Sequence, residues 1–132
     1  MNLAATRIIT DDVDVLITFY ERITGVTANR IHPLFGELAT DSGTLAIMSS
    51  ATVPLLGEGA AEAGVNRSVM LDFLVDDVDA LYPTLTDAVP EFVSAPTTMP
   101  WGNRSLLFRD PDGNLINFFT PITPAARERF GL

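Results

Sequence analysis

The sequence contains no cysteine, which excludes disulfide bonds, a thiolate nucleophile and any metal centre with cysteine ligands. It has one histidine, His32, which precedes Pro33 and which we interpret as a solvated turn residue. Basic side chains are scarce. The sequence has 8 basic residues (lysine plus arginine) and 17 acidic ones, which gives a formal net charge of −9. This charge repels phosphate backbones and anionic lipids, so we expect neither nucleic acid nor a membrane surface as a partner.

Long apolar runs are also missing, and none could span a bilayer. The N-terminus lacks the basic flank and apolar core of an export signal, so we expect a cytoplasmic protein, in keeping with the absence of cysteine. The sequence is rich in apolar side chains, which make up 47% of its 132 residues. That content is typical of a soluble globular protein, and the length of the chain corresponds to one domain or two small fused halves.

An internal repeat organises the chain. The segment Asp11–Asp14 (DDVD) recurs as Asp76–Asp79, an offset of 65 residues from position 11 to position 76. Apolar positions recur at the same offset and have the i, i+3, i+4, i+7 spacing of one helix face. These positions are Val13, Leu16, Ile17 and Tyr20 in the first copy, and Val78, Leu81, Tyr82 and Leu85 in the second. The pattern predicts two tandem copies of one structural module.

Each copy reads as a β-α-β-β-β module, so the predicted fold class is α+β. In the first copy we expect strands at 3–9, 26–31, 34–40 and 44–49, and a helix from the repeated aspartates to Thr24, ended by Gly25. In the second we expect strands at 68–75, 92–98, 103–109 and 114–120. Pro83 predicts a kink or a late start in the second helix. The expected divisions are a module at 1–50, a flexible glycine-rich linker at 51–67, a module at 68–122, and a short helix or frayed tail at 123–132.

The stretch from Trp101 to Phe119 reads as a hairpin with a tight turn at 110–113. Pro111 presets the backbone angle of the turn, and Gly113 adopts an angle that a β-carbon would resist. Asn117 is the one polar residue in the apolar run that follows the turn. A lone amide in a buried strand needs a partner or a ligand, so this residue is the first indication of a site.

The two modules, the aspartate-rich entry into each helix, and the closing hairpin with Trp101, Gly102, Arg104 and the DPDGN turn resemble the vicinal oxygen chelate superfamily. That superfamily includes glyoxalase I, extradiol dioxygenases, fosfomycin-resistance enzymes, and bleomycin- and mitomycin-binding resistance proteins. The resemblance covers almost the whole chain. It implies a curled mixed sheet around a ligand cavity, the glyoxalase/bleomycin resistance fold.

The resemblance also maps the positions at which the enzymes of the superfamily hold a divalent metal. They fall on Ala5, near Ile47, on Met70 and on Asn117. Alanine and isoleucine cannot ligate, a thioether is too soft for Mg²⁺ or Mn²⁺, and one amide oxygen makes a poor site. We therefore expect no metal and no cofactor.

If the mapped positions face inward, alternation along the strands selects their neighbours. The expected ligand-binding set is Arg7, Ile47, Ser49, Met70, Asp72, Asn117 and Phe119. By resemblance to the fosfomycin enzymes, it also includes Asn103, Ser105 and Leu107, with Trp101 at the rim. Arg7 and Asp72 form either a ligand-orienting charge pair or a structural salt bridge, and Trp101 is either a stacking platform or a packing residue. Arg104 is expected over the helix side of the sheet, in a structural role.

Three functions fit these observations. The first is a metal-free protein that binds a small, largely apolar or aromatic molecule, as in antibiotic sequestration, which needs affinity but no transition-state stabilisation. The second is a lyase, isomerase or dioxygenase-type enzyme of the same superfamily with a non-standard or absent metal, for example with Asp72 as a base. The third is a ligand-sensing or assembly module. The resemblance further implies a homodimer, because many relatives complete each cavity with modules from two chains.

Overall fold

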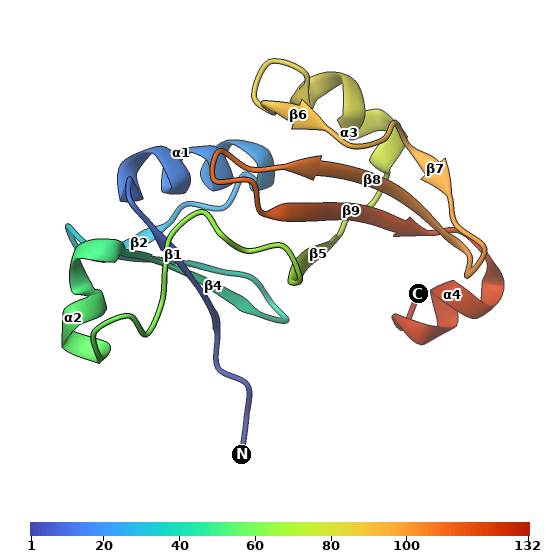
Figure 1. Cartoon of the computed structure of the whole chain (residues 1–132). Helices are drawn as coiled ribbons and strands as arrows, with labels where there is room; N and C mark the ends of the chain where they lie inside the picture. Colours follow the sequence, from blue (N-terminus) through green and yellow to red (C-terminus); the bar gives the residue numbers. More distant parts are fainter. The chain divides into compact units, whose positions relative to one another are not determined.

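The computed structural model describes all 132 residues and divides them into two compact units, each built on its own mixed sheet (Figure 1). One unit comprises Met1–Asn66 with Pro111–Gly113, and the other comprises Arg67–Asp110 with Asn114–Leu132. The chain is therefore an α+β protein with a repeated order of elements, which confirms the predicted fold class. None of its helices combines the length and the apolar character needed to cross a membrane.

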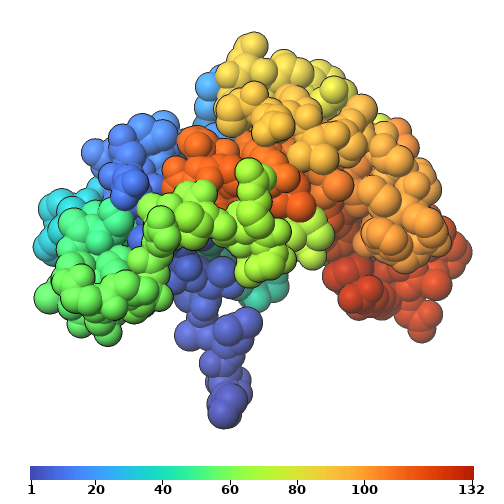
Figure 2. All heavy atoms as spheres, viewed as in Figure 1, coloured from blue at the N-terminus to red at the C-terminus, as the bar shows by residue number.

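The first unit holds a four-stranded sheet in the order β1-β4-β3-β2, in which β1 runs parallel to β4 and the other neighbours are antiparallel. Its elements are β1 (Thr6–Thr10), α1 (Val13–Thr24), β2 (Asn29–His32), β3 (Phe35–Ala39) and β4 (Thr44–Ser49). A 3₁₀ turn, η1 (Ser50–Thr52), and a short helix, α2 (Val53–Leu56), follow in the stretch after β4. The segment before β1 is exposed, and Figure 2 shows it as a narrow arm in deep blue.

Helix α1 begins and ends where local signals predict. The Asp12 side chain accepts a hydrogen bond from the Val15 N–H at 3.1 Å and so caps the first turn. Gly25 adopts a left-handed conformation, with φ of 71°, and ends the helix. The apolar stripe that includes Leu16 and Ile17 is buried, and α1 packs on β3 and β4. Gly36 permits this close packing, because a Cβ there would lie 2.6 Å from Ile17 Cδ1.

The second unit holds a five-stranded sheet in the order β5-β9-β8-β6, with β7 also paired to β8. Strand β5 is parallel to β9, and the other pairs are antiparallel. Its elements are β5 (Met70–Leu74), α3 (Val78–Leu85), β6 (Glu91–Phe92), β7 (Thr97–Thr98), β8 (Asn103–Arg109), β9 (Leu115–Pro121) and α4 (Pro124–Arg129). The short terminal helix α4 confirms the helical alternative for the tail, and Thr123 caps it by accepting from the Ala126 N–H.

Helix α3 begins at Val78, directly after its cap Asp77, so the prediction of a late start is wrong. The Asp77 carboxylate accepts from the Ala80 N–H at 3.1 Å and fixes the first turn despite the proline downstream. Pro83 lies inside the helix, which ends two residues later at Leu85. Pro83 has no N–H to donate to the preceding turn, and α3 is the shorter helix, with 8 residues compared with 12 in α1.

The single strand predicted at 92–98 is wrong, because two strands of two residues each occupy this region. The N–H groups of Val93 and Ser94 both donate to the Leu107 carbonyl, at 2.8 and 3.2 Å. Two residues thus oppose one on β8, which is the arrangement of a β-bulge. The bulge interrupts the ladder before pairing resumes between Thr97 and Ser105.

The core of the second unit is a chain of aromatic rings between α3 and the sheet. Tyr82 of α3 meets Phe92 edge-on at a centroid distance of 5.2 Å. Phe108 lies 5.1 Å from Phe118, which lies 5.6 Å from Phe73. Edge-to-face contacts of this kind add to the free energy of apolar burial. They fix which face of the sheet looks toward α3.

Candidate functional site

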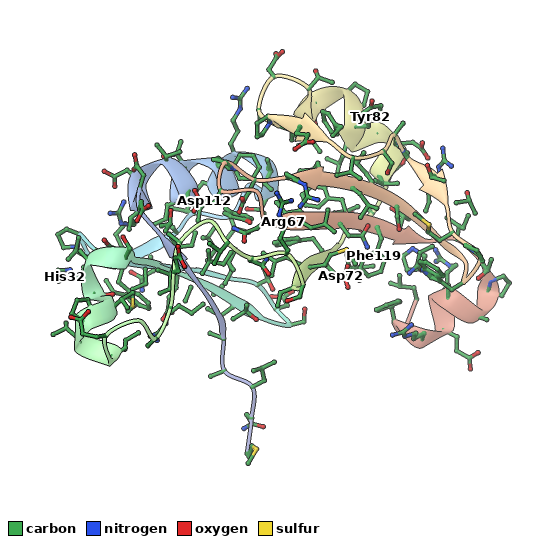
Figure 3. The ribbon with its side chains drawn as sticks, in the orientation of Figure 1. His32, Arg67, Asp72, Tyr82, Asp112 and Phe119 are labelled. Atoms are coloured by element: carbon green, nitrogen blue, oxygen red, sulfur yellow. The ribbon has the colours of Figure 1, made fainter.

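The side of the second sheet that faces away from α3 gathers most of the predicted site residues. Phe108 and Phe118 point toward the helix, so alternation sends their neighbours along β8 and β9 to the opposite side. In Figure 3, Asp72 and Phe119 lie on the side of the strands away from Tyr82. We call this side the open face and define it by Met70, Asp72, Leu74, Asn103, Ser105, Leu107, Asn117 and Phe119.

The register shows how the open face is laid out. Asp72 lies opposite Asn117, which lies opposite Leu107 in the next strand. The neighbouring row contains Leu74, Phe119 and Ser105. The structure thus brings these predicted residues to one face, as the alternation predicts, and their binding of a ligand stays a prediction. Met70 and Leu74 on the edge strand β5 are 44% and 49% exposed, whereas Ser105 and Phe119 on the inner strands are buried.

Asn117 is held by Asp72 and has one buried atom without a partner. Its Nδ2 donates to Asp72 Oδ1 at 2.9 Å. An ionised carboxylate can only accept hydrogen bonds, so this contact fixes which end of the amide faces Asp72. The amide oxygen, Oδ1, is therefore turned away from the carboxylate, and it is buried with no hydrogen-bond donor. Such an atom is costly to bury and is well suited to accept from a ligand.

Asn103 repeats this situation at the other end of the face. It opens β8, its side chain is only 9% exposed, and its Oδ1 is buried with no donor. The side chain of Ser105, two residues along the strand, is also buried. Buried amides in folded proteins are almost always hydrogen-bonded, so two orphaned amide oxygens on one face require an explanation.

Trp101 lies on the turn that leads into β8. The Gly102 N–H donates to the Met99 carbonyl at 3.0 Å, and the Met99 N–H donates to the Asn103 carbonyl at 2.8 Å. This tight turn leaves Trp101 64% exposed, next to the end of the face that carries Asn103. Gly102 has φ of 93°, and any Cβ there would collide with Thr123. The turn therefore requires glycine at position 102.

The predicted turn between β8 and β9 is confirmed and is held by a buried carboxylate. Asp110 is 2% exposed and accepts from the Asn114 backbone N–H at 2.9 Å and from Asn114 Nδ2 at 2.8 Å. The Asp110 N–H donates to the Asn114 carbonyl at 3.0 Å. Gly113 has φ of 84°, as the turn requires. The turn thereby fixes the register that sets Asn117 opposite Leu107.

Arg104 lies on the helix side, as expected. Its Nε and Nη2 donate to the two carboxylate oxygens of Asp79 at 2.7 and 2.9 Å, and Asp79 belongs to the first turn of α3. The hydrogen bond from Arg104 lowers the pKa of Asp79, and the same contact raises the pKa of Arg104. This bidentate pair links α3 to β8 and takes no part in the open face.

In the first unit, the register places Arg7 and Ile47 on opposite sides of the sheet. Arg7 lies beside Ala46, and its Nη1 donates to Met48 Sδ at 3.6 Å. The Arg7 guanidinium also lies 5.4 Å from the centre of the Phe35 ring. Arg7, Met48 and Phe35 therefore share the side of this sheet away from α1.

The expectation that Ile47 shares the side of Arg7 is wrong. Ile47 is opposite Gly36, the residue against which Ile17 of α1 packs closely, and Ile47 is fully buried. Ser49 lies two residues along on the same side, beside Thr10, and its Oγ accepts from the Ala51 N–H at 3.1 Å to cap the next turn. The expected inward placement of Ser49 is wrong for the same reason of register. A shift of one residue reverses every side chain of a strand.

Met48 and Phe35 are the residues of this face that sequence reasoning missed. The run from Leu45 to Met48 is apolar throughout, so it offers no alternation from which to choose a side. The small residue at Gly36 is the signal that could have helped, because it indicates close approach of a helix to the residue opposite. Arg7 and Asp72 belong to different units, and their pairing stays a prediction.

The residues at the family's metal positions do not fit a divalent cation. Ala5 precedes β1, Ile47 faces α1, and Met70 offers only a thioether. Asn117 turns its amide N–H toward Asp72, so the two residues do not present a pair of oxygens to a cation. No group of three or more His, Asp or Glu side chains that could hold a metal occurs in the structure.

The fold and this arrangement define a class of small proteins made of two βαβββ modules, each with a helix packed on one side of its sheet. The chain belongs to the Glyoxalase/Bleomycin resistance protein/Dioxygenase superfamily, whose family model matches residues 2–118. No curated protein matches the sequence.

Solved structures show the same fold at low sequence identity. A glyoxalase/bleomycin resistance protein/dioxygenase family enzyme from Burkholderia phytofirmans PsJN superimposes with a TM-score of 0.82 at 20% identity, over 92% of this chain and 100% of that one. A glyoxalase/bleomycin resistance protein/dioxygenase from Nocardioides gives 0.76 at 22% identity, over 94% and 85%. A glyoxalase-related enzyme from Fulvimarina pelagi gives 0.77 at 19% identity, over 90% and 87%. At these identities the likeness establishes the fold alone.

Proposed function

We propose that this protein binds a small, largely apolar or aromatic molecule on the open face, without a divalent metal, and acts by sequestration in the manner of an antibiotic-binding resistance protein. The observation that carries the proposal is the buried Oδ1 of Asn117, which lacks a donor while Asp72 holds the rest of the amide. Such a group is a specificity element of the kind found in small-molecule sites, which are mostly apolar with a few placed polar atoms.

The surrounding side chains support the same proposal. Leu107 and Phe119 adjoin Asn117, and Met70 and Leu74 lie exposed on the edge strand. Burial of such surface contributes roughly 25 cal/mol per Å², so apolar contact would supply most of the affinity. Trp101 at the end of the face would stack on a ring, a contact worth on the order of 1 kcal/mol beyond its area.

The test is native mass spectrometry of gently purified protein, followed by calorimetric titration of aromatic compounds. We expect a co-purifying small molecule or saturable binding, and Trp101→Ala should weaken that binding by about 1 kcal/mol. Asn2→Leu, a change in the exposed N-terminal segment, is the control and should leave affinity unaltered. Binding that ignores both Trp101→Ala and Asn117→Leu would refute the assignment of the site to this face.

The metal-free part of the proposal has its own experiment. Elemental analysis of protein purified without chelator should find no stoichiometric Zn, Ni, Mn or Fe, because the donor set at Met70 and Asn117 suits none of them. Near-stoichiometric metal that disappears in Asn117→Leu would contradict this part. We further propose a cytoplasmic homodimer, since the closed twofold dimer is the commonest soluble assembly. A monomer by light scattering at micromolar concentration would contradict the dimer.

A further inference from the structure

The edge strand of the second sheet carries an exposed carboxylate between two exposed apolar side chains. Phe73 of β5 packs against Phe118 on the helix side, with ring centres 5.6 Å apart. Alternation therefore sends Met70, Asp72 and Leu74 to the open face, where Figure 3 shows Asp72. We call these three residues the β5 row. All three are exposed, because no further strand of this sheet lies beside β5, so the row is accessible to a ligand.

The Asp72 carboxylate is held in place but has no cation beside it. Asn117 Nδ2 donates to Asp72 Oδ1 at 2.9 Å and so fixes the orientation of the carboxylate. Within the second unit Asp72 forms no ion pair, and its other oxygen, Oδ2, has no hydrogen bond. The row therefore presents an oriented, negatively charged acceptor whose charge no side chain of that unit neutralises.

The amide that holds Asp72 adds to the preference for positive charge. Asn117 Oδ1 is buried without a donor, so the negative end of the amide dipole has no compensating partner. It belongs to the same amide group that contacts Asp72. The atoms of this pair that lack a partner are thus both oxygens, and an ionised carboxylate can only accept hydrogen bonds. Such a pair attracts a cation and repels an anion.

We infer that the β5 row binds an organic cation, a protonated amine carried on an apolar body. This inference rests on the proposed function and specifies its ligand class. The ammonium group donates to Asp72 Oδ2, and the apolar body covers Met70 and Leu74, which are 44% and 49% exposed. A bare metal cation does not suit the row, because it needs several oxygen ligands and gains nothing from the two apolar side chains.

Three naphthalenes that differ in one substituent test the inference by calorimetry at neutral pH: 2-(aminomethyl)naphthalene, 2-(hydroxymethyl)naphthalene and 2-naphthoate. They share an apolar body and carry a cation, a neutral group and an anion. The amine should bind about fivefold more tightly than the alcohol, which is the upper end of the effect of an exposed ion pair. The naphthoate should bind more weakly than the alcohol, because Asp72 repels it.

Asp72→Asn keeps the shape of the side chain and removes its charge, so the amine and the alcohol should then bind equally. Asp41→Asn is the matched control, because Asp41 is an exposed aspartate of the first unit and the net charge changes by the same amount. This control should retain the preference for the amine. It separates the β5 row from the general attraction of an acidic protein for cations.

Leu74→Ala tests the apolar part of the row. It should weaken the amine and the alcohol by the same factor, about threefold, because both lose the same apolar contact. Leu55→Ala changes a leucine of α2 that is 87% exposed and should leave all three affinities unaltered. Circular dichroism should show native folding for every variant.

The inference would be overturned by equal binding of the amine and the alcohol to the wild type, by a preference that survives Asp72→Asn, or by one that Asp41→Asn also removes. Each of these outcomes leaves the proposed function standing, because the neutral naphthalene still binds. Absence of saturable binding for all three compounds would refute the proposed function and the inference together.

Discussion

Replacing Asn103 with leucine should stabilise the protein, although the change removes a polar side chain. The side chain is 9% exposed, and its amide oxygen has no donor. Burial of an unsatisfied amide costs about 1–3 kcal/mol. Leucine has the same branched arrangement of side-chain heavy atoms and no polar atom, so Asn103→Leu should recover that cost. At about 2.1 cal/mol/K per residue over 132 residues, the gain corresponds to a rise in Tm of about 4–11 °C.

Asn114 provides the matched control, because it is at least as buried and its amide nitrogen has a hydrogen-bond partner. Its Nδ2 donates to Asp110 Oδ2 at 2.8 Å, and the Asp110 side chain is itself buried. Asn114→Leu removes a partner from a buried carboxylate and should destabilise the protein by about 3 kcal/mol. Urea unfolding followed by circular dichroism measures both variants. If Asn103→Leu lowers the free energy of unfolding as Asn114→Leu does, the Asn103 amide has a partner and the reasoning fails.

Three further changes probe the scaffold. Ile47→Ala should lower the free energy of unfolding in urea by about 2–5 kcal/mol and leave the ligand affinity measured by calorimetry unchanged. A loss of binding without a loss of stability would show that Ile47 belongs to the site. Gly102→Ala should lower stability by about 1–3 kcal/mol, since its φ is positive and Thr123 fills the space; an unchanged Tm would contradict this. The hydrogen bond from Arg104 lowers the pKa of Asp79, so this pair stabilises the fold above the ordinary carboxyl pKa of about 4 and is lost as pH falls through the lowered value. Wild type should thus exceed Asp79→Asn in stability at neutral pH, and the gap should close in strong acid; a constant gap would exclude the ion pair as its source.

The sequence predicts what short-range signals control. Asp12 and Asp77 cap their helices, Gly25 ends the first, and the turn after Arg109 closes as its residues predict. Each of these features depends on a few adjacent side chains and backbone angles. The alternation of β8 and β9 likewise brings the residues of the open face together, because one side of that sheet meets α3.

Features that depend on pairing between distant strands were beyond the sequence. Ile47 lies in an apolar run with no alternation, so only its alignment with Ile8 and Gly36 reveals its side. The bulge at Val93 arises from two N–H groups that share the carbonyl of Leu107. The sequence also does not show that the Asn103 amide oxygen lacks a donor, because this depends on which groups lie near it in the folded structure.

The exposure of Trp101 has a spectroscopic consequence. An indole that is already 64% exposed in the folded state emits much as it would in the unfolded chain, so its fluorescence should report unfolding poorly. Tyr20, by contrast, is fully buried in the first unit, and its environment changes completely when the core opens. The chain thus carries separate reporters: tyrosine signals follow the integrity of the fold, whereas a blue shift of the single tryptophan would mark a molecule covering the end of the open face.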